Sequence, residues 1–91
     1  MAQRGKAETK RTPRRFYVYV LSCEDGSFYT GYTTSLEKRL RLHKSGKGAL
    51  YTHIHGAVKM THYEVFATRS AAMRRERQIK RLTHHQKAKL L

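Results

Sequence analysis

Hydrophobic positions divide the chain after residue 15 into segments with the periodicity of strands or of helices. Phe16 to Leu21 is a run of aromatic and aliphatic residues, which is typical of a buried strand. Asp25-Gly26 favours a hairpin turn, so Ser27 to Tyr32 is predicted to be the returning strand. Apolar and polar residues alternate from Val58 to Phe66, which indicates a third strand.

The first predicted helix lies between the hairpin and the third strand. Thr34 and Ser35 are both suitable N-cap residues, and Glu37 stands at capping-box spacing from Thr34. The helix is expected to run to about Ser45 and to stop at Gly46, because glycine commonly follows the last helical turn.

Two more helices are predicted after the third strand. Ser70 is the expected N-cap of a helix that ends near Leu82, and Thr83 with Gln86 has the capping-box pattern of a short last helix. The segment that follows the first helix contains Gly48 and is expected to be a loose loop. The resulting order, ββαβαα, predicts an α+β fold in which helices flank a three-stranded antiparallel sheet.

Two tyrosine tripeptides, Tyr17-Val18-Tyr19 and Tyr29-Thr30-Gly31, fall on the two hairpin strands. A two-residue turn would place Tyr19 and Tyr29 on opposite faces of the sheet, because side chains alternate along a strand. A three-residue loop, Glu24-Asp25-Gly26, would instead pair Tyr19 with Gly31 and put both tyrosines on one face. We favour the three-residue loop, and we expect Gly31 to leave a gap beside Tyr19 for a phosphate.

The charge of the chain indicates what it binds. There are 20 lysines and arginines against 6 acidic residues, a net charge of +14. A field of this sign attracts polyanions, either nucleic acid or an anionic membrane surface, and nucleic acid is the expected partner. Residues 1–15 carry six of the basic residues without hydrophobic periodicity, so we predict a disordered basic arm followed by one domain over residues 16–91.

Several other classes of protein are not favoured. No apolar run is long enough for a transmembrane helix, and the N-terminus lacks the apolar region of a secretory signal, so no membrane role is expected. Cys23 is the only cysteine, which excludes an intrachain disulfide and fits a cytoplasmic protein. His53 and His55 lack a third ligand at suitable spacing for zinc.

Arg39 and His43 are candidates for chemistry on the first helix. Leu36, Leu40 and His43 form one stripe, and Arg39 stands at its edge, so both polar side chains can lean over the sheet. The guanidinium fork of arginine matches phosphate oxygens, whereas the structural alternative is a solvated arginine.

Glu76 is an unexpected charge on the apolar side of its helix, the side that it shares with Ala72 and Ile79. A carboxylate in that position is costly unless it is paired or binds a metal. Three interpretations stay open: an i,i+4 pair with Lys80, a buried pair with Arg39, or a single-carboxylate metal site. Phosphate oxygens and water would complete such a site, and magnesium suits it.

Tyr19 and Tyr29 could take part in proton transfer. The phenol pKa is near 10, too high for an efficient base at neutral pH unless a basic pocket or metal-bound water lowers it. The structural alternative for both residues is core packing with a hydrogen-bonded hydroxyl.

Together these residues resemble the signature of the GIY-YIG nucleases. Both tyrosine tripeptides, Arg39 and Glu76 match in order and spacing, and the likeness to small standalone bacterial members covers about residues 16–85. The further matches are Asp25-Gly26-Ser27, Leu36-Glu37, Leu40, His43, Gly46-Lys47-Gly48-Ala49, Tyr51-Thr52, Ala72, Ile79-Lys80 and Leu82. The resemblance implies the same three-stranded fold and metal-dependent hydrolysis of DNA phosphodiesters.

The resemblance also implies a role for each site residue. Tyr29 would activate the attacking water, and Tyr19 would orient it. Arg39 would stabilise charge on the phosphoryl oxygens, and Glu76 would hold one Mg²⁺ or Mn²⁺ ion. His43 occupies a position near the nucleophile.

The expected nucleic-acid contacts are basic residues of the helices and the glycine loop: Lys38, Lys47, Arg74, Arg75 and Arg77. The chain contains no asparagine, although family nucleases often carry one in the active site. These 91 residues also offer only the basic arm and the helices for holding DNA, so an accessory protein is an expected partner for targeting. The alternatives are a nucleic-acid-binding module that does not cut without a partner, and a structural basic protein.

Overall fold

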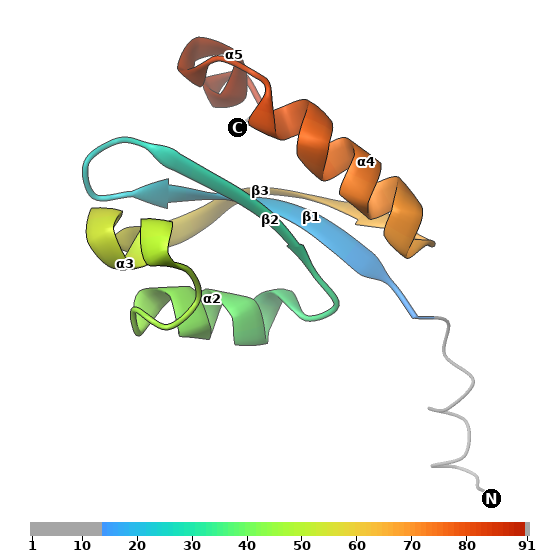
Figure 1. Ribbon diagram of the computed structural model, residues 1–91, viewed down its shortest axis with the longest axis horizontal. Helices are drawn as coiled ribbons and strands as arrows, with labels where there is room; N and C mark the ends of the chain where they lie inside the picture. The colour runs from blue at the N-terminus through green and yellow to red at the C-terminus, as the bar shows by residue number, and fades with distance from the viewer. Residues whose placement is uncertain (1–13, 91) are drawn as a thin grey trace, which may run out of the picture.

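Three antiparallel strands form the centre of the structure, a computed structural model that describes residues 14–90. The strands are β1 (Phe16–Cys23), β2 (Phe28–Thr33) and β3 (Ala57–Phe66), in the order β2-β1-β3. The helices are α2 (Leu36–Lys44), α3 (Leu50–His55), α4 (Arg69–Lys80) and α5 (His84–Ala88). Helices α2 and α3 lie on one side of the sheet and α4 on the other (Figure 1). The predicted α+β class is confirmed.

The predicted basic arm lies mostly outside the residues that the structure describes. Of residues 1–15, only Arg14 and Arg15 lie within the described residues, and both are exposed and without regular structure. Within residues 14–90, no helix has the length and apolar character that a membrane span requires.

The hairpin has the predicted three-residue loop. The N–H of Cys23 donates to the Ser27 carbonyl at 2.9 Å, and Gly26 has a φ of +86°, which favours glycine. Tyr19 therefore pairs with Gly31 across β1 and β2, and the side chains of successive residues on β1 point to opposite faces. The central strand thus contributes to both faces of the sheet.

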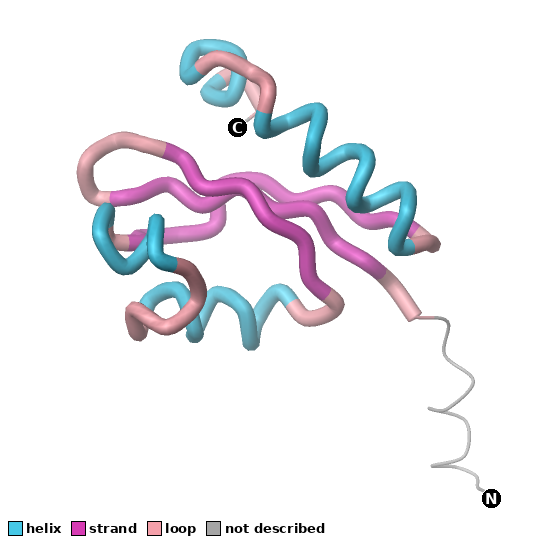
Figure 2. The backbone as a smooth tube through the Cα atoms, viewed as in Figure 1, coloured by secondary structure: helices cyan, strands magenta, loops and turns pink. Residues whose placement is uncertain are grey.

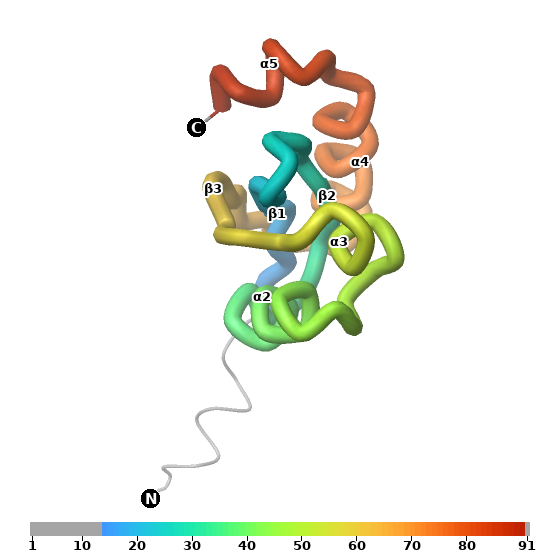
Figure 3. Tube along the Cα trace, turned by 90° about the vertical axis from the view of Figure 1, so that its left-hand side faces the viewer, coloured from blue at the N-terminus to red at the C-terminus, as the bar shows by residue number. Residues whose placement is uncertain are grey.

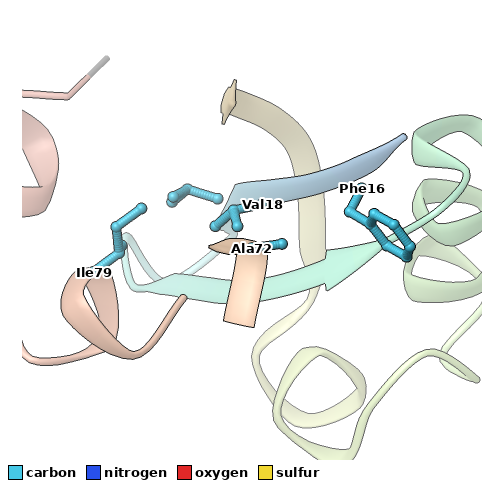
Figure 4. Close-up of a cluster of buried hydrophobic side chains, with 5 residues drawn as sticks. Phe16, Val18, Ala72 and Ile79 are labelled. Carbon is cyan, nitrogen blue, oxygen red and sulfur yellow. The ribbon is translucent and has the colours of Figure 1, made fainter. Parts of the chain in front are cut away.

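The face toward α4 holds the apolar core. Its buried members are Phe16, Val18, Val20, Ala72 and Ile79, and Figure 4 labels four of them, with Val18 and Ala72 between Phe16 and Ile79. The core is closed at its edge by an ion pair in which the Arg75 guanidinium donates twice to Glu64, at 2.7 and 3.0 Å. This face fixes where α4 lies and therefore where Glu76 lies.

One helix was not predicted from the sequence. Residues 50–55 form α3, whereas we expected a loose segment after Gly48 (Figure 2). Gly48 is packed tightly instead, because a Cβ added there would lie 2.5 Å from Nδ1 of His43. The fold consequently has the order ββααβαα over residues 14–90 rather than ββαβαα.

The N-termini of the helices contradict two details of the predicted capping and confirm a third. Ser35 is the N-cap of α2, and Glu37 forms an ion pair with Arg41 rather than a capping box with Thr34. The N-cap of α4 is Thr68, whose hydroxyl accepts from the Ala71 N–H at 3.2 Å. The prediction that Ser70 is the N-cap is therefore wrong. The capping box that joins Thr83 and Gln86 at the start of α5 is confirmed.

Candidate functional site

Three polar side chains form a buried hydrogen-bonded chain on the face of the sheet that α2 and α3 cover. The Tyr19 hydroxyl lies 2.8 Å from Nε2 of His43, and Nδ1 of His43 lies 2.7 Å from the Thr52 hydroxyl. All three residues are almost completely buried, with exposures of 2%, 1% and 1%. Buried polar groups require such partners, so the three side chains hold one another in place.

The direction of these hydrogen bonds follows from Thr52. Its hydroxyl donates to the Ala49 carbonyl at 3.2 Å, and therefore accepts from Nδ1–H of His43. A neutral histidine protonated at Nδ1 has Nε2 free to accept, so Tyr19 donates its only proton to His43. The phenol oxygen of Tyr19 retains its lone pairs for another donor.

The pKa values of Tyr19 and His43 support this arrangement of protons. Burial, followed by the nearby Tyr29, raises the pKa of the Tyr19 phenol well above its usual value. Burial, followed by the charge of Arg39, lowers the pKa of His43. Tyr19 therefore stays protonated and His43 stays neutral near pH 7.

Gly31 allows Tyr19 to occupy its position, and it corrects the prediction of a gap for phosphate. A Cβ added to Gly31 would lie 2.6 Å from the Tyr19 hydroxyl and 3.2 Å from the Tyr29 ring. The space above Gly31 is thus filled by the phenol of Tyr19, and a phosphate could not enter it. Glycine is needed here because the ring crosses close to the β2 backbone.

Tyr29 lies beside these hydrogen-bonded side chains and is less buried than Tyr19. Its ring centroid is 6.4 Å from that of Tyr19 and 5.0 Å from that of His43. Tyr51 of α3 packs on the other side of Tyr29, with 5.9 Å between the centroids. The predicted shared face of Tyr19 and Tyr29 is confirmed, and His43 joins them there.

Arg39 and Glu76 lie on helices that pack on opposite faces of the sheet. Arg39 lies on α2 and Glu76 on α4, and both affect the pKa of Tyr19, Arg39 by lowering it and Glu76 by raising it. Figure 3 shows these two helices on either side of the strands. Tyr29 therefore packs beside Tyr19, and the charges of Arg39 and Glu76 are near enough to act on its phenol.

Of the three interpretations of Glu76, the structure contains the pair with Lys80. Oε2 of Glu76 lies 3.3 Å from the Lys80 ammonium, and the Glu76 side chain is 17% exposed whereas that of Lys80 is 53% exposed. No ion pair joins Glu76 to Arg39 within residues 14–90. Such an exposed partner contributes only a few tenths of a kcal/mol, so the pair leaves Glu76 available to a stronger ligand.

Glu76 is a single carboxylate, so a metal ion held by it would take its other ligands from water or from a substrate. Within residues 14–90, no group of three or more histidine, cysteine or acidic side chains could enclose a metal. A half-buried carboxylate that is open to solvent on one side suits an ion that keeps several waters and takes phosphate oxygens from a substrate. Glu76 would hold the ion.

The predicted nucleic-acid contacts are in different situations. Lys38, Lys47, Arg74 and Arg77 are exposed, which leaves them accessible to phosphate. Arg75 is held by Glu64 through two hydrogen bonds, and the partnership raises the pKa of Arg75 and lowers that of Glu64. Arg75 therefore has a structural partner that the sequence did not indicate.

Thr52 is the residue of this site that sequence reasoning missed as a functional group. Its role depends on α3, which was not predicted, and on the contact with His43 nine residues earlier. The signal that could have found it is the Tyr51-Thr52 pair, which is one of the positions matched to the family.

Comparison with known proteins decides the family. The model of the GIY-YIG catalytic domain matches residues 15–89. The chain belongs to the GIY-YIG family. Its relatives include a UPF0213 protein of Haloquadratum walsbyi, 50% identical over 81% of this chain and 83% of that one. Another, from Staphylococcus haemolyticus, is 46% identical over 85% of this chain and 94% of its own length.

A solved structure supports the same grouping. The solution NMR structure of a UPF0213 protein from Bacillus halodurans matches with a TM-score of 0.53 at 43% identity. The match covers 84% of this chain and 81% of that chain. Family membership and fold are thus established together for nearly all of the described residues.

Proposed function

We propose that this GIY-YIG protein is a DNA endonuclease that hydrolyses phosphodiester bonds with the help of one Mg²⁺ or Mn²⁺ ion. The observation that carries the proposal is the cluster of Tyr19, Tyr29 and His43 on one face of the sheet, with the charges of Arg39 and Glu76 acting on the Tyr19 phenol. A purely structural tyrosine would need one hydrogen-bond partner, which His43 already supplies. The guanidinium, the carboxylate and the second phenol are additional, and together they provide the groups that phosphodiester hydrolysis needs.

Tyr19 acts in this proposal as a positioning acceptor for the attacking water. Because its proton is donated to His43, Tyr19 can accept a hydrogen bond but cannot donate one to the phosphate. A water that donates to Tyr19 keeps a lone pair for attack on phosphorus. Thr52 and His43 set the direction in which the phenol oxygen accepts.

Tyr29 is the group we assign to proton removal from that water. It lies on the same face and is less enclosed than Tyr19, so a substrate can approach it. Attack forms the new oxygen–phosphorus bond as the water's proton passes to the Tyr29 oxygen, which acts as a phenolate base or as a phenol that hands its own proton on to solvent. The bond to the leaving oxygen breaks, and that oxygen takes a proton from solvent water. Arg39 stabilises the charge that develops on the phosphoryl oxygens.

Glu76 would hold the divalent ion, which supplies charge stabilisation at the phosphate and at the leaving oxygen. The carboxylate is placed for this by the apolar contacts of Ala72 and Ile79 on the same helix, which keep α4 against the sheet. A helix held in this way has little freedom to withdraw its carboxylate from the site.

The test is cleavage of labelled single-stranded, duplex and branched DNA with Mg²⁺ or Mn²⁺. Glu76→Gln and Tyr29→Phe should each reduce the cleavage rate by at least about a hundredfold, the scale of losing one transition-state contact. Glu37→Gln and Tyr17→Phe are matched controls at positions outside the site and should cut normally. Equal rates for wild type, Glu76→Gln and Tyr29→Phe would refute the assignment.

The 3.3 Å pair between Glu76 and Lys80 favours a second candidate function, a nucleic-acid-binding module that needs a partner protein before it cuts. In that case the isolated chain would bind DNA without metal-dependent cleavage. Binding alone, with Glu76→Gln indistinguishable from wild type in every metal, would favour this candidate.

A further inference from the structure

Beside the proposed catalytic site, three arginines from separate parts of the chain line one cavity. The cavity has a volume of about 390 Å³, and its walls are Arg14, Tyr32, Thr33, Thr34, Arg39 and Arg69. Arg14 precedes β1, Arg39 lies on α2, and Arg69 is the first residue of α4. None of the lining residues is acidic, so the three guanidinium groups share a space without a carboxylate in its wall.

This arrangement is unfavourable unless an anion joins it. Like charges repel, and the ion pairs formed within residues 14–90 involve other basic residues, namely Arg41, Arg75, Lys80 and two histidines. The cavity also lies where two helices begin, since Thr34 directly precedes the N-cap of α2 and Arg69 follows the N-cap of α4. Helix N-termini add partial positive charge to the same space.

Two features keep the cavity in place. The Arg69 guanidinium lies over the ring of Phe16, 5.3 Å from the centroid, and Phe16 belongs to the buried core. The Thr33 hydroxyl accepts from the N–H of Ser35 at 3.1 Å and so fixes the turn into α2. Arg39 and Arg69 are therefore attached to helices, and Arg14 lies two residues before β1.

The position of the cavity indicates which anion it would take. Thr33 is two residues beyond Gly31 on β2, roughly 7 Å along the strand from the residue under the Tyr19 phenol. Arg39 belongs both to this cavity and to the group around Tyr19. A nucleic-acid strand whose scissile phosphate lies beside Tyr29 and Arg39, which are less buried than Tyr19, would bring a neighbouring backbone phosphate to the cavity.

We propose that Arg14, Arg69 and the cavity side of Arg39 bind a backbone phosphate adjacent to the one that is cut. The assignment rests on the proposed nuclease function for the identity of the scissile site. It makes Arg14 and Arg69 positioning residues that hold the strand in register. A fork of donors from each arginine matches the oxygens of a phosphodiester.

The binding test uses the full chain with Glu76→Gln and a metal chelator, so that no DNA is cut. Fluorescence anisotropy with a labelled oligonucleotide is measured over a range of salt concentrations. The double variant Arg14→Gln, Arg69→Gln should bind DNA about tenfold more weakly. The slope of log affinity against log salt concentration should fall by about the amount expected for one phosphate contact. Arg81→Gln, an exposed arginine at the other end of α4, is the matched control and should leave the slope unchanged.

Two results would overturn the assignment. One is an equal loss of affinity and slope in the paired variant and in Arg81→Gln, which would mean a diffuse charge effect. The other is normal DNA binding together with a lowered melting temperature, both in the paired variant and in Arg14→Gln alone. That result would mean that the arginines have a structural role. Because binding is measured without metal, failure to cut DNA would count only against the proposed function.

A second measurement locates the phosphate on the DNA. Single neutral methylphosphonate linkages beside the cleavage position should slow cutting by wild type at one flanking position. The same linkage should have no further effect in Arg69→Gln, since the contact is already lost. Additive losses at that position would contradict the proposed contact.

Discussion

One face of the sheet packs apolar side chains against α4, whereas the opposite face buries a hydrogen-bonded chain beneath α2 and α3. Val18, Val20 and Ile79 are fully buried on the first face. Tyr19, His43 and Thr52 are almost equally buried on the second, and each of their hydrogen bonds has a direction. Apolar burial stabilises without specifying orientation, whereas the polar chain specifies where one phenol oxygen points.

The central strand supplies both faces, since Val18 and Val20 alternate with Tyr19 along β1. A domain of this size has room for only one apolar core, and here that core lies on the α4 face. The second face can therefore hold buried polar groups for chemistry. Substitutions on the first face are expected to change stability, and those on the second to change both stability and activity.

The largest effect is expected on the apolar face, from Ile79→Ala. Removing this fully buried side chain should lower the free energy of unfolding by about 2–5 kcal/mol, because it deletes buried methyl groups and leaves a cavity. Ile54→Ala is the matched control: Ile54 is 66% exposed, and its loss should change stability by less than about 0.5 kcal/mol. Urea unfolding followed by circular dichroism measures both, and similar losses would contradict the location of the core.

The next effect is on the polar face, from Tyr19→Phe. The change keeps the ring but leaves Nε2 of buried His43 without its donor, which should cost about 1–3 kcal/mol of stability. Tyr17→Phe on the same strand face is the control, since the Tyr17 hydroxyl makes no hydrogen bond within residues 14–90 and its ring packs edge-on against that of Tyr63. If Tyr17→Phe costs as much in the same unfolding experiment, the hydrogen bond to His43 is not the cause.

The first face and the hairpin were predictable from the sequence because local signals specify them. Asp25-Gly26 with Gly26 at a positive φ sets the loop, and the loop sets the register that brings Tyr19 and Tyr29 together. The apolar spacing of Ala72 and Ile79 likewise placed Glu76 on the inward side of α4. In each case neighbouring residues carry the information.

The second face was predicted only in part because its contacts are between segments. Helix α3 has six residues, and its N-cap, Ala49, makes no side-chain hydrogen bond, so no local signal marks its start. It is held by the contact between His43 and Thr52. The filled space over Gly31 depends on where the Tyr19 ring lies, which strand alternation alone does not determine.

A smaller effect on stability is expected when the pH is lowered, because His43 lies on the polar face. The pKa of His43 is lowered by burial and by Arg39, below the value of about 6.5 that applies in the unfolded chain. The unfolded state therefore binds more protons just below pH 6.5, and stability should fall as pH decreases from there until the folded pKa is passed.

Urea unfolding between pH 7.5 and pH 5 measures this dependence. His43→Gln should be less stable than wild type at the higher pH but should show a flatter decline, whereas exposed His85→Gln should decline as wild type does. A decline in His43→Gln as steep as that of wild type would place its origin in other groups.

The smallest effect on stability is expected from breaking the pair between Glu76 and Lys80 on α4. Lys80→Ala removes an i,i+4 pair whose lysine is 53% exposed, so the free energy of unfolding should change by less than about 0.5 kcal/mol, as for Arg41→Ala in the exposed pair with Glu37. Metal binding should respond in the opposite direction. Without the competing ammonium, Mn²⁺ should broaden the NMR amide signals around Glu76 at a lower concentration than in wild type. Unchanged or weaker Mn²⁺ binding in Lys80→Ala would mean that the carboxylate is not the metal ligand, and Glu76 would then belong to the structural face alone.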